Sequence, residues 1–292
     1  MERAVYYDRK QPGYPPRLLE LERMPAGLYV IGTLPEPSDK SVAIVGARSC
    51  SDYGRKEAVR FARELAKHGV QIISGLAYGI DAWAHWGALE GGGRTFAVLG
   101  SGADVCYPRA NYPLYRRIIR EGGGILSEFA PGSPPAAWHF PLRNRIISGL
   151  ADLVLVVEAR KKSGALITVD YALEQGKSVY AVPGRLGDPL SEGCNLLLAQ
   201  GAAPACSPEQ LLEELGISAA AKDCGSRIRE TEQLEKNLRE LCAQLQAGPA
   251  GLVKLREALG WELGKLSSAI VDLQLQGYIE ELQPGIYRLV SR

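Results

Sequence analysis

Residues 41–75 read SVAIVGARSCSDYGRKEAVRFARELAKHGVQIISG, and this stretch decides the fold class. An apolar, β-branched run at 42–45 precedes a helix-length segment at 54–68, and a second apolar run follows at 71–73. Such runs are typical of strands that helices cover on both faces, as in a parallel sheet. Further runs of this kind occupy residues 95–99, 124–126, 153–157 and 178–182. The alternation of strands and helices predicts a doubly wound α/β domain over residues 41–215.

Two other segments flank this domain. Residues 1–40 are rich in proline, and we expect them to form an irregular N-terminal extension with one apolar run at 28–31. Residues 216–232 contain mainly alanine, serine and charged residues, which indicates a linker. Residues 233–292 then predict three helices (234–245, 252–259 and 262–276) followed by a hairpin (278–282 and 286–290). This order is typical of a small winged-helix domain.

Composition limits the function classes. The chain has 292 residues, of which 46% are hydrophobic, so a wholly disordered protein is excluded. The 34 Lys and Arg residues nearly balance the 33 Asp and Glu residues, so any basic surface must be local. The six cysteines include no C-x-x-C pair, and we expect reduced thiols in a cytoplasmic protein, with no metal site and no cofactor. No secretory signal or membrane span is expected.

Small and basic residues gather where the predicted strands end. Gly46, Arg48 and Ser51 follow the first strand, and Gly75 follows the second. A third loop, after the strand at 153–157, contributes Lys162, Ser163 and Gly164. Ligands of open parallel sheets bind at these strand ends, and glycine lets backbone N–H groups approach an anion. The loops predict a phosphate-binding edge; the alternative is that the glycines only permit tight turns.

A second candidate site lies in the segment WHFPLRNRII, residues 138–147. We expect Arg143, Asn144 and Arg145 to open a helix, where two guanidinium groups and an amide suit phosphate oxygens. Phe140, just before them, could stack on a base. In the alternative interpretation, Phe140 belongs to the core and the arginines pair with Glu128 or Glu158.

Seven stretches of the chain resemble the DNA processing protein A family, also called Smf, in the family's order. They read VGARSCSDYG (45–54), SGLAYGIDAWAH (74–85), AVLGSGADVCYPRANYPLY (97–115), LSEFAPGSPP (126–135), HFPLRNRIISGLAD (139–152), VVEARKKSGALITVDYALEQGKSVYAVPG (156–184) and GCNLLLAQGA (193–202). The resemblance implies an extended Rossmann-like domain that binds single-stranded DNA without sequence preference. It also implies a homodimer that protects incoming strands in natural transformation and loads the recombinase RecA, and no enzymatic activity.

The resemblance also assigns residues by position. Arg48 matches the family's phosphate-gripping arginine, Phe140 to Arg145 match its F-P-x-R-N-R segment, and Lys162 to Gly164 match the neighbouring loop. The chain departs from the family at residues 135–138, which are uncharged where relatives often have a Lys or Arg.

Two rival functions remain open. The first is a nucleotide hydrolase of the phosphoribohydrolase type, although the catalytic glutamate and Gly-rich loop of such enzymes have no counterpart here. The second is a transcription factor that uses the C-terminal domain. Residues 234–292 hold seven Lys or Arg and seven Asp or Glu, so we expect a protein-contact or auxiliary module in place of a duplex reader.

Overall fold

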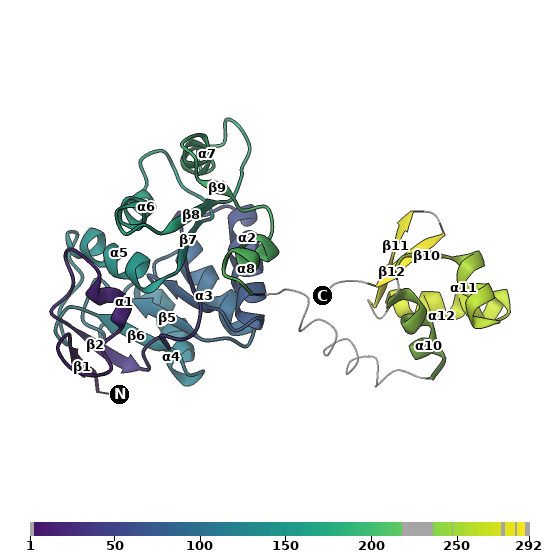
Figure 1. Cartoon of the computed structure of the whole chain (residues 1–292), viewed down its shortest axis with the longest axis horizontal. Helices are drawn as coiled ribbons and strands as arrows, with labels where there is room; N and C mark the ends of the chain where they lie inside the picture. The colour runs from purple at the N-terminus through teal and green to yellow at the C-terminus, as the bar shows by residue number, and fades with distance from the viewer. Residues whose placement is uncertain (1–2, 218–235, 247, 276–277, 284, 290–292) are drawn as a thin grey trace. The chain divides into compact units, whose positions relative to one another are not determined.

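Strands that run parallel to one another form the middle of a nine-stranded sheet in the computed structural model (Figure 1), which describes residues 3–217, 236–246, 248–275, 278–283 and 285–289. The order across the sheet is β1-β2-β6-β5-β4-β3-β7-β8-β9. The strands are β1 (Val5–Asp8), β2 (Gly27–Gly32), β3 (Ser41–Val45), β4 (Gln71–Ser74), β5 (Thr95–Val98), β6 (Gly124–Ser127), β7 (Leu153–Val156), β8 (Ser178–Ala181) and β9 (Ala203–Pro204). The predicted α/β class and the mostly parallel sheet are confirmed.

The sheet is wound in two directions from β3. The chain proceeds outward through β4, β5 and β6, then returns to place β7 on the other side of β3 and continues to β8 and β9. All of these pairings are parallel. β3 and β7 are neighbours, and the loops that follow them lead away from each other. The space between these two loops is the crevice where open α/β sheets bind ligands.

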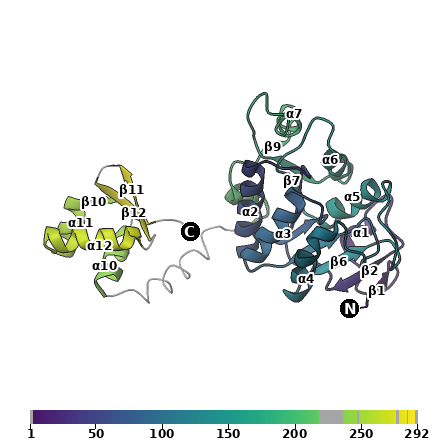
Figure 2. The same cartoon turned by 180° about the vertical axis from the view of Figure 1, so that it is seen from behind.

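Helices cover both faces of the sheet (Figures 1 and 2). Alternate residues of β3 separate the two cores: Ala43 and Val45 belong to one, Val42 and Ile44 to the other. The first core includes α1 (Pro16–Leu19), α5 (His139–Leu150), α6 (Gly164–Glu174) and α7 (Glu192–Ala199). The other face is covered by α2 (Asp52–Lys67), α3 (Ile80–Glu90), α4 (Tyr112–Arg120) and α8 (Pro208–Glu214). A 3-10 turn, η1 (Arg109–Asn111), precedes α4.

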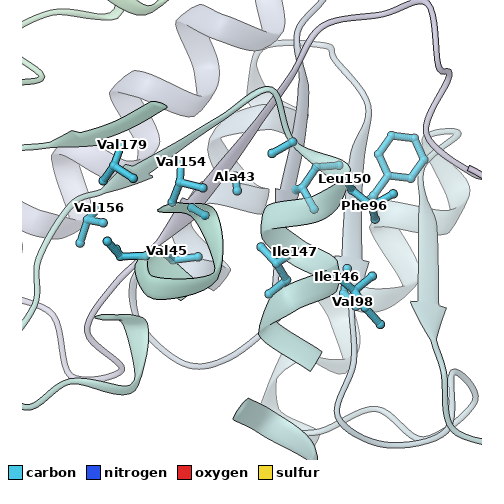
Figure 3. Close-up of a cluster of buried hydrophobic side chains, with 14 of the residues drawn as sticks. Ala43, Val45, Phe96, Val98, Ile146, Ile147, Leu150, Val154, Val156 and Val179 are labelled. Atoms are coloured by element: carbon cyan, nitrogen blue, oxygen red, sulfur yellow. The ribbon is translucent and has the colours of Figure 1, made fainter. Parts of the chain in front are cut away.

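Helix α5 packs on the sheet through three apolar residues. Ile146, Ile147 and Leu150 are almost fully buried. Figure 3 shows them among side chains of the central strands, including Val45 and Val98. This packing fixes the orientation of α5, and with it the direction of each polar side chain on the helix.

The expectation of an irregular segment before residue 41 is wrong. Strand β1 pairs antiparallel with β2, and β2 pairs antiparallel with β6, so these residues extend the same sheet. Leu28 and Val30 of β2 are buried in the first core. Proline is confined to the connections around these strands, where it costs no ladder hydrogen bond.

The chain divides into two units, residues 1–219 and 220–292. The second unit contains α10 (Lys236–Gln246), α11 (Leu252–Leu259) and α12 (Leu263–Leu275), and a sheet in which β12 (Ile286–Leu289) lies between β10 (Ala250–Gly251) and β11 (Ile279–Gln283). Leu241, Leu266 and Leu273 form part of its separate core. The helices and hairpin follow the predicted order, whereas the winged-helix assignment itself stays a prediction. The predicted linker lies outside the described residues from residue 218 onward.

No helix in the described part of the chain is both long enough and apolar enough to cross a membrane.

Candidate functional site

A pocket of about 620 Å³ opens at the strand ends between β3 and β7. Its walls come from the loops after these two strands, from the start of α6 and from one side of α5. Eight of the eleven residues selected from the sequence line it: Gly46, Arg48, Phe140, Arg143, Asn144, Lys162, Ser163 and Gly164. The other three, Ser51, Gly75 and Arg145, are not among the lining residues.

The loop after β3 fits its surroundings only with glycine at its first position. A Cβ atom on Gly46 would lie 2.7 Å from Ile80 Cγ1 and 2.8 Å from the carbonyl oxygen of Glu158, which is closer than side chains tolerate. Two residues on, Arg48 is exposed, and its guanidinium carbon lies 5.2 Å from the centre of the Phe140 ring. The tight turn thus brings a cation and an aromatic ring together at the pocket.

Ser51 has a structural contact with the buried carboxylate of Glu158. Its hydroxyl donates to Glu158 Oε1 over 2.5 Å, and its backbone N–H donates to Oε2 over 2.9 Å. The same hydroxyl accepts from Gly54 N and caps α2. A Cβ atom on Gly54 would lie 2.2 Å from Glu158 Oε2. The positive end of α2 is therefore occupied by a carboxylate of the protein itself.

Helix α6, in contrast, presents its N-terminus to the pocket. Ser163 caps the helix by accepting from Ala165 N, and both residues line the pocket together with Gly164. Asn144 Nδ2 donates to Gly164 O over 3.3 Å and connects α5 to this turn. Unpaired N–H groups and the helix dipole favour an anion at such a helix end.

The start of α5 differs from the sequence prediction. The helix begins at His139, so Arg143, Asn144 and Arg145 belong to its second turn, and the expectation that they open the helix is wrong. Pro141 is the third helical residue, where a missing N–H costs no hydrogen bond. Phe140 is half-buried and lines the pocket, with Tyr107 at 5.7 Å between ring centres.

Arg143 is almost fully buried and connects the ends of two strands, β4 and β5. Its Nη1 donates to Gly75 O over 2.7 Å and also to Val98 O. Gly75 N in turn donates to Asp81 Oδ2 over 3.2 Å. A Cβ atom on Gly75 would lie 2.1 Å from Arg143 Nη1 and 2.6 Å from Asp81 Oδ2. Gly75 is therefore a spacer between the arginine and the carboxylate.

Burial shifts the pKa values of this group. It lowers the pKa of Arg143 to about 10, so the guanidinium stays charged at neutral pH. Burial raises the pKa of Asp81, and the charge of Arg143 opposes that shift. Burial also lowers the pKa of the nearby His85 to about 3, with a smaller contribution from Arg143. His85 Nδ1 lies 2.6 Å from Thr95 Oγ1, so Thr95 is its hydrogen-bond partner.

Arg145 points away from the pocket toward the loop after β6. Its Nη2 donates to Glu128 Oε2 over 2.6 Å; Arg145 is buried and Glu128 is mostly buried. Of the two alternatives for the arginine pair, the structure thus gives Arg145 the carboxylate partner and leaves Arg143 at the pocket wall.

The pocket is strongly cationic for a chain with almost no net charge. Four cations line it (Arg48, Arg143, Arg160 and Lys162) against the single carboxylate of Asp81. Sequence reasoning did not select Arg160 and Asp81. Arg160 lies two residues before Lys162 in the same loop, and Asp81 lies in the first turn of α3 after the β4 loop. Among the described residues, no three His, Cys, Asp or Glu side chains gather as metal ligands.

Comparisons with known proteins identify relatives of this chain. Residues 5–216 match the model of the DNA recombination-mediator protein A family. The chain is 38% identical to Protein Smf of Escherichia coli over 94% of its length and 75% of that protein. It is 44% identical to DNA processing protein DprA of Streptococcus pneumoniae over 69% of its length and 71% of that protein.

Two solved structures are also similar. The structure of DNA processing protein A from Streptococcus pneumoniae superposes with a TM-score of 0.68 at 41% identity, covering 72% of this chain and 74% of that one. A structure of DNA processing protein A from Helicobacter pylori, which concerns its single-stranded DNA binding mode, gives a TM-score of 0.64 at 30% identity and covers 72% and 95%.

Proposed function

The chain belongs to the DNA recombination-mediator protein A family, and from this membership we propose that it binds single-stranded DNA, without sequence preference, at the pocket between β3 and β7. The observation that carries the proposal is the excess of cations at that pocket, four against one carboxylate. A polyanion binds most strongly where exposed cations and an open helix N-terminus face the same space.

We assign the phosphate contacts to groups that are free to make them. Arg48, Arg160 and Lys162 are exposed at the pocket mouth. The backbone N–H groups at the start of α6, next to Ser163 and Gly164, supply further donors. Arg143 contributes its buried positive charge. Gly46 lets the loop after β3 pack closely against Ile80 and the backbone of Glu158. Ser51, Gly75 and Arg145 act as positioning residues, because each already makes a polar contact within the protein.

Phe140 provides the base contact. Its ring lies beside Arg48, so a nucleotide whose base stacks on the ring would have its phosphate within reach of the guanidinium. Any base can stack on an aromatic ring, and contacts between cations and phosphates do not depend on the base sequence. The site therefore favours single strands, whose bases are open to stacking, over duplexes.

The test is a salt titration of binding to single-stranded and duplex oligonucleotides, with wild type, Arg48→Ala and Arg120→Ala. Arg120 is exposed at the C-terminal end of α4, outside the pocket lining, so the control variant loses the same charge. Arg48→Ala should weaken binding to all single-stranded sequences alike and reduce the slope of log K against log salt by about 0.7 for each lost contact. Equal affinities for Arg48→Ala and Arg120→Ala would refute the site.

The wider role is also a proposal from family membership. We propose a cytoplasmic, non-enzymatic homodimer that protects incoming strands during natural transformation and loads RecA on them. Light scattering of the purified chain measures the oligomeric state. Assembly of RecA on single strands, followed with and without the protein, measures loading. An unchanged assembly rate would contradict that role.

For the C-terminal unit we propose an auxiliary role. Its helix α12 carries Lys265, which lies over the Trp261 ring at 4.3 Å, and Asp272. A helix that reads a DNA groove normally presents several basic or amide side chains. Duplex binding that depends on residues 230–292 would contradict the proposal.

A further inference from the structure

Trp138 is an exposed aromatic residue directly beside the pocket. Its side chain is 64% exposed, although tryptophan is among the residues that gain most from burial. Its chain neighbour Ala137 lines the pocket, and so does Phe140 two residues later. Trp138 itself is not among the lining residues, so the segment before Phe140 forms the rim of the proposed DNA site.

The ring is held by other aromatic side chains. Its centre is 4.0 Å from that of His139, at 76°, and 5.9 Å from that of Phe129, at 85°. Phe129 and His139 stack on each other at 3.7 Å. His139 Nδ1 lies 2.9 Å from Gly100 O, and since a carbonyl only accepts, Nδ1 donates this bond.

The segment before Trp138 is also fixed. Gly132 N donates to Asp104 Oδ1 over 2.8 Å, and Gly102 N donates to Ser133 O over 2.9 Å. Pro134 and Pro135 restrict the backbone between Ser133 and Trp138. Ordering such a platform on binding costs little conformational entropy, because the order already exists.

The chemistry of the segment selects the type of ligand group. Residues 133–138 contain no Lys or Arg, so this part of the rim cannot contact a phosphate through a charge. An exposed indole beside a cationic pocket suits the flat face of a nucleobase, which every nucleotide carries. The cations of the pocket thus suit the phosphates of a nucleotide chain, and the exposed ring suits its bases.

We propose that Trp138 is a second stacking site, which takes a base next to the one on Phe140 and extends the contact with the strand beyond the pocket. This inference rests on the proposed function. It predicts a contact that depends on bases and not on phosphates.

The test compares Trp138→Ala, Trp138→Phe, Arg48→Ala and the control Tyr6→Ala, an exposed aromatic residue on the edge strand β1. Each binds an oligothymidylate and an abasic oligonucleotide of equal length, which keeps the phosphates but has no bases. Thermal unfolding followed by circular dichroism confirms that each variant is folded.

We expect Trp138→Ala to weaken oligothymidylate binding about tenfold and to leave the abasic affinity and the salt slope unchanged. Trp138→Phe should retain most of the affinity, and Arg48→Ala should lose affinity for both oligonucleotides. Wild-type affinity of Trp138→Ala, or an equal loss on both oligonucleotides, would overturn the inference while the pocket assignment stands. If wild type binds neither oligonucleotide, the proposed function itself fails.

Discussion

Arg145→Ala should lower stability, because the side chain forms a buried ion pair and does not line the proposed DNA pocket. The side chains of Arg145 and Glu128 are 7% and 13% exposed, and their ion pair spans 2.6 Å. Removing one member of a buried pair leaves the other charge unpaired, at a cost of about 3–5 kcal/mol. For a unit of residues 1–219, this cost lowers the unfolding midpoint by roughly 10 °C.

A double variant separates the ion pair from simple loss of packing. Arg145 Nε and Nη1 and Glu128 Oε1 are buried without a hydrogen-bond partner among the described residues, so the wild-type pair is incompletely compensated. Replacing both partners, as in Glu128→Leu with Arg145→Met, should therefore recover most of the lost stability.

The assay is thermal unfolding by circular dichroism, combined with single-strand binding well below the midpoint. Arg145→Ala should unfold early and still bind, whereas Arg48→Ala should unfold like wild type and bind weakly. If Arg145→Ala unfolds at the wild-type temperature and loses binding as Arg48→Ala does, the separation of the two arginines is refuted.

Three further predictions concern the same unit. Gly75→Ala should destabilise the fold by about 1–3 kcal/mol in urea unfolding, because its Cβ would overlap Arg143 and Asp81; wild-type stability would contradict the close approach. The pKa of His85 falls from about 6.5 unfolded to about 3 folded. The unfolded chain therefore binds the extra proton, and this contribution, up to roughly 5 kcal/mol, is present above pH 6.5 and lost as the pH falls toward 3. His85→Gln should show a shallower loss of stability with acid across that range, and identical pH profiles would disprove the cause. A chain ending at residue 219 should keep single-strand affinity within a few-fold of the full chain in fluorescence anisotropy, since the pocket lies within that unit; loss of binding would show that the C-terminal unit is required.

The central strands could be predicted from the sequence because burial on both faces leaves an unmistakable pattern of apolar residues. Runs such as 42–45 and 153–157 have no polar alternation, and the structure places strands there. Strand β1 reads VYYD and has exposed residues, so its sequence carries no such pattern. Its position depends on antiparallel pairing with β2, which a local sequence does not specify.

The pocket residues in loops at strand ends could be predicted from the sequence. Which residues of helix α5 face the pocket could not be predicted, because the direction of a side chain there depends on its position around the helix. Gly46, Arg48 and Ser163 lie in loops at strand ends, and loop position alone brings them together. Arg143 and Arg145 have the same chemistry in sequence, yet two residues along a helix turn a side chain by about 200°. The partner of Arg145, Glu128, lies 17 residues away, so only the folded chain shows which arginine faces the pocket.

The carboxylate of Glu158 occupies one of the two helix N-termini that follow the strands β3 and β7. It contacts Ser51 at the N-terminus of α2, so of the two helices that follow β3 and β7, α2 and α6, the N-terminus of α6 is the one left to an incoming polyanion. A strand bound as proposed would therefore meet a helix N-terminus on the β7 side of the pocket and a carboxylate of the protein itself on the β3 side.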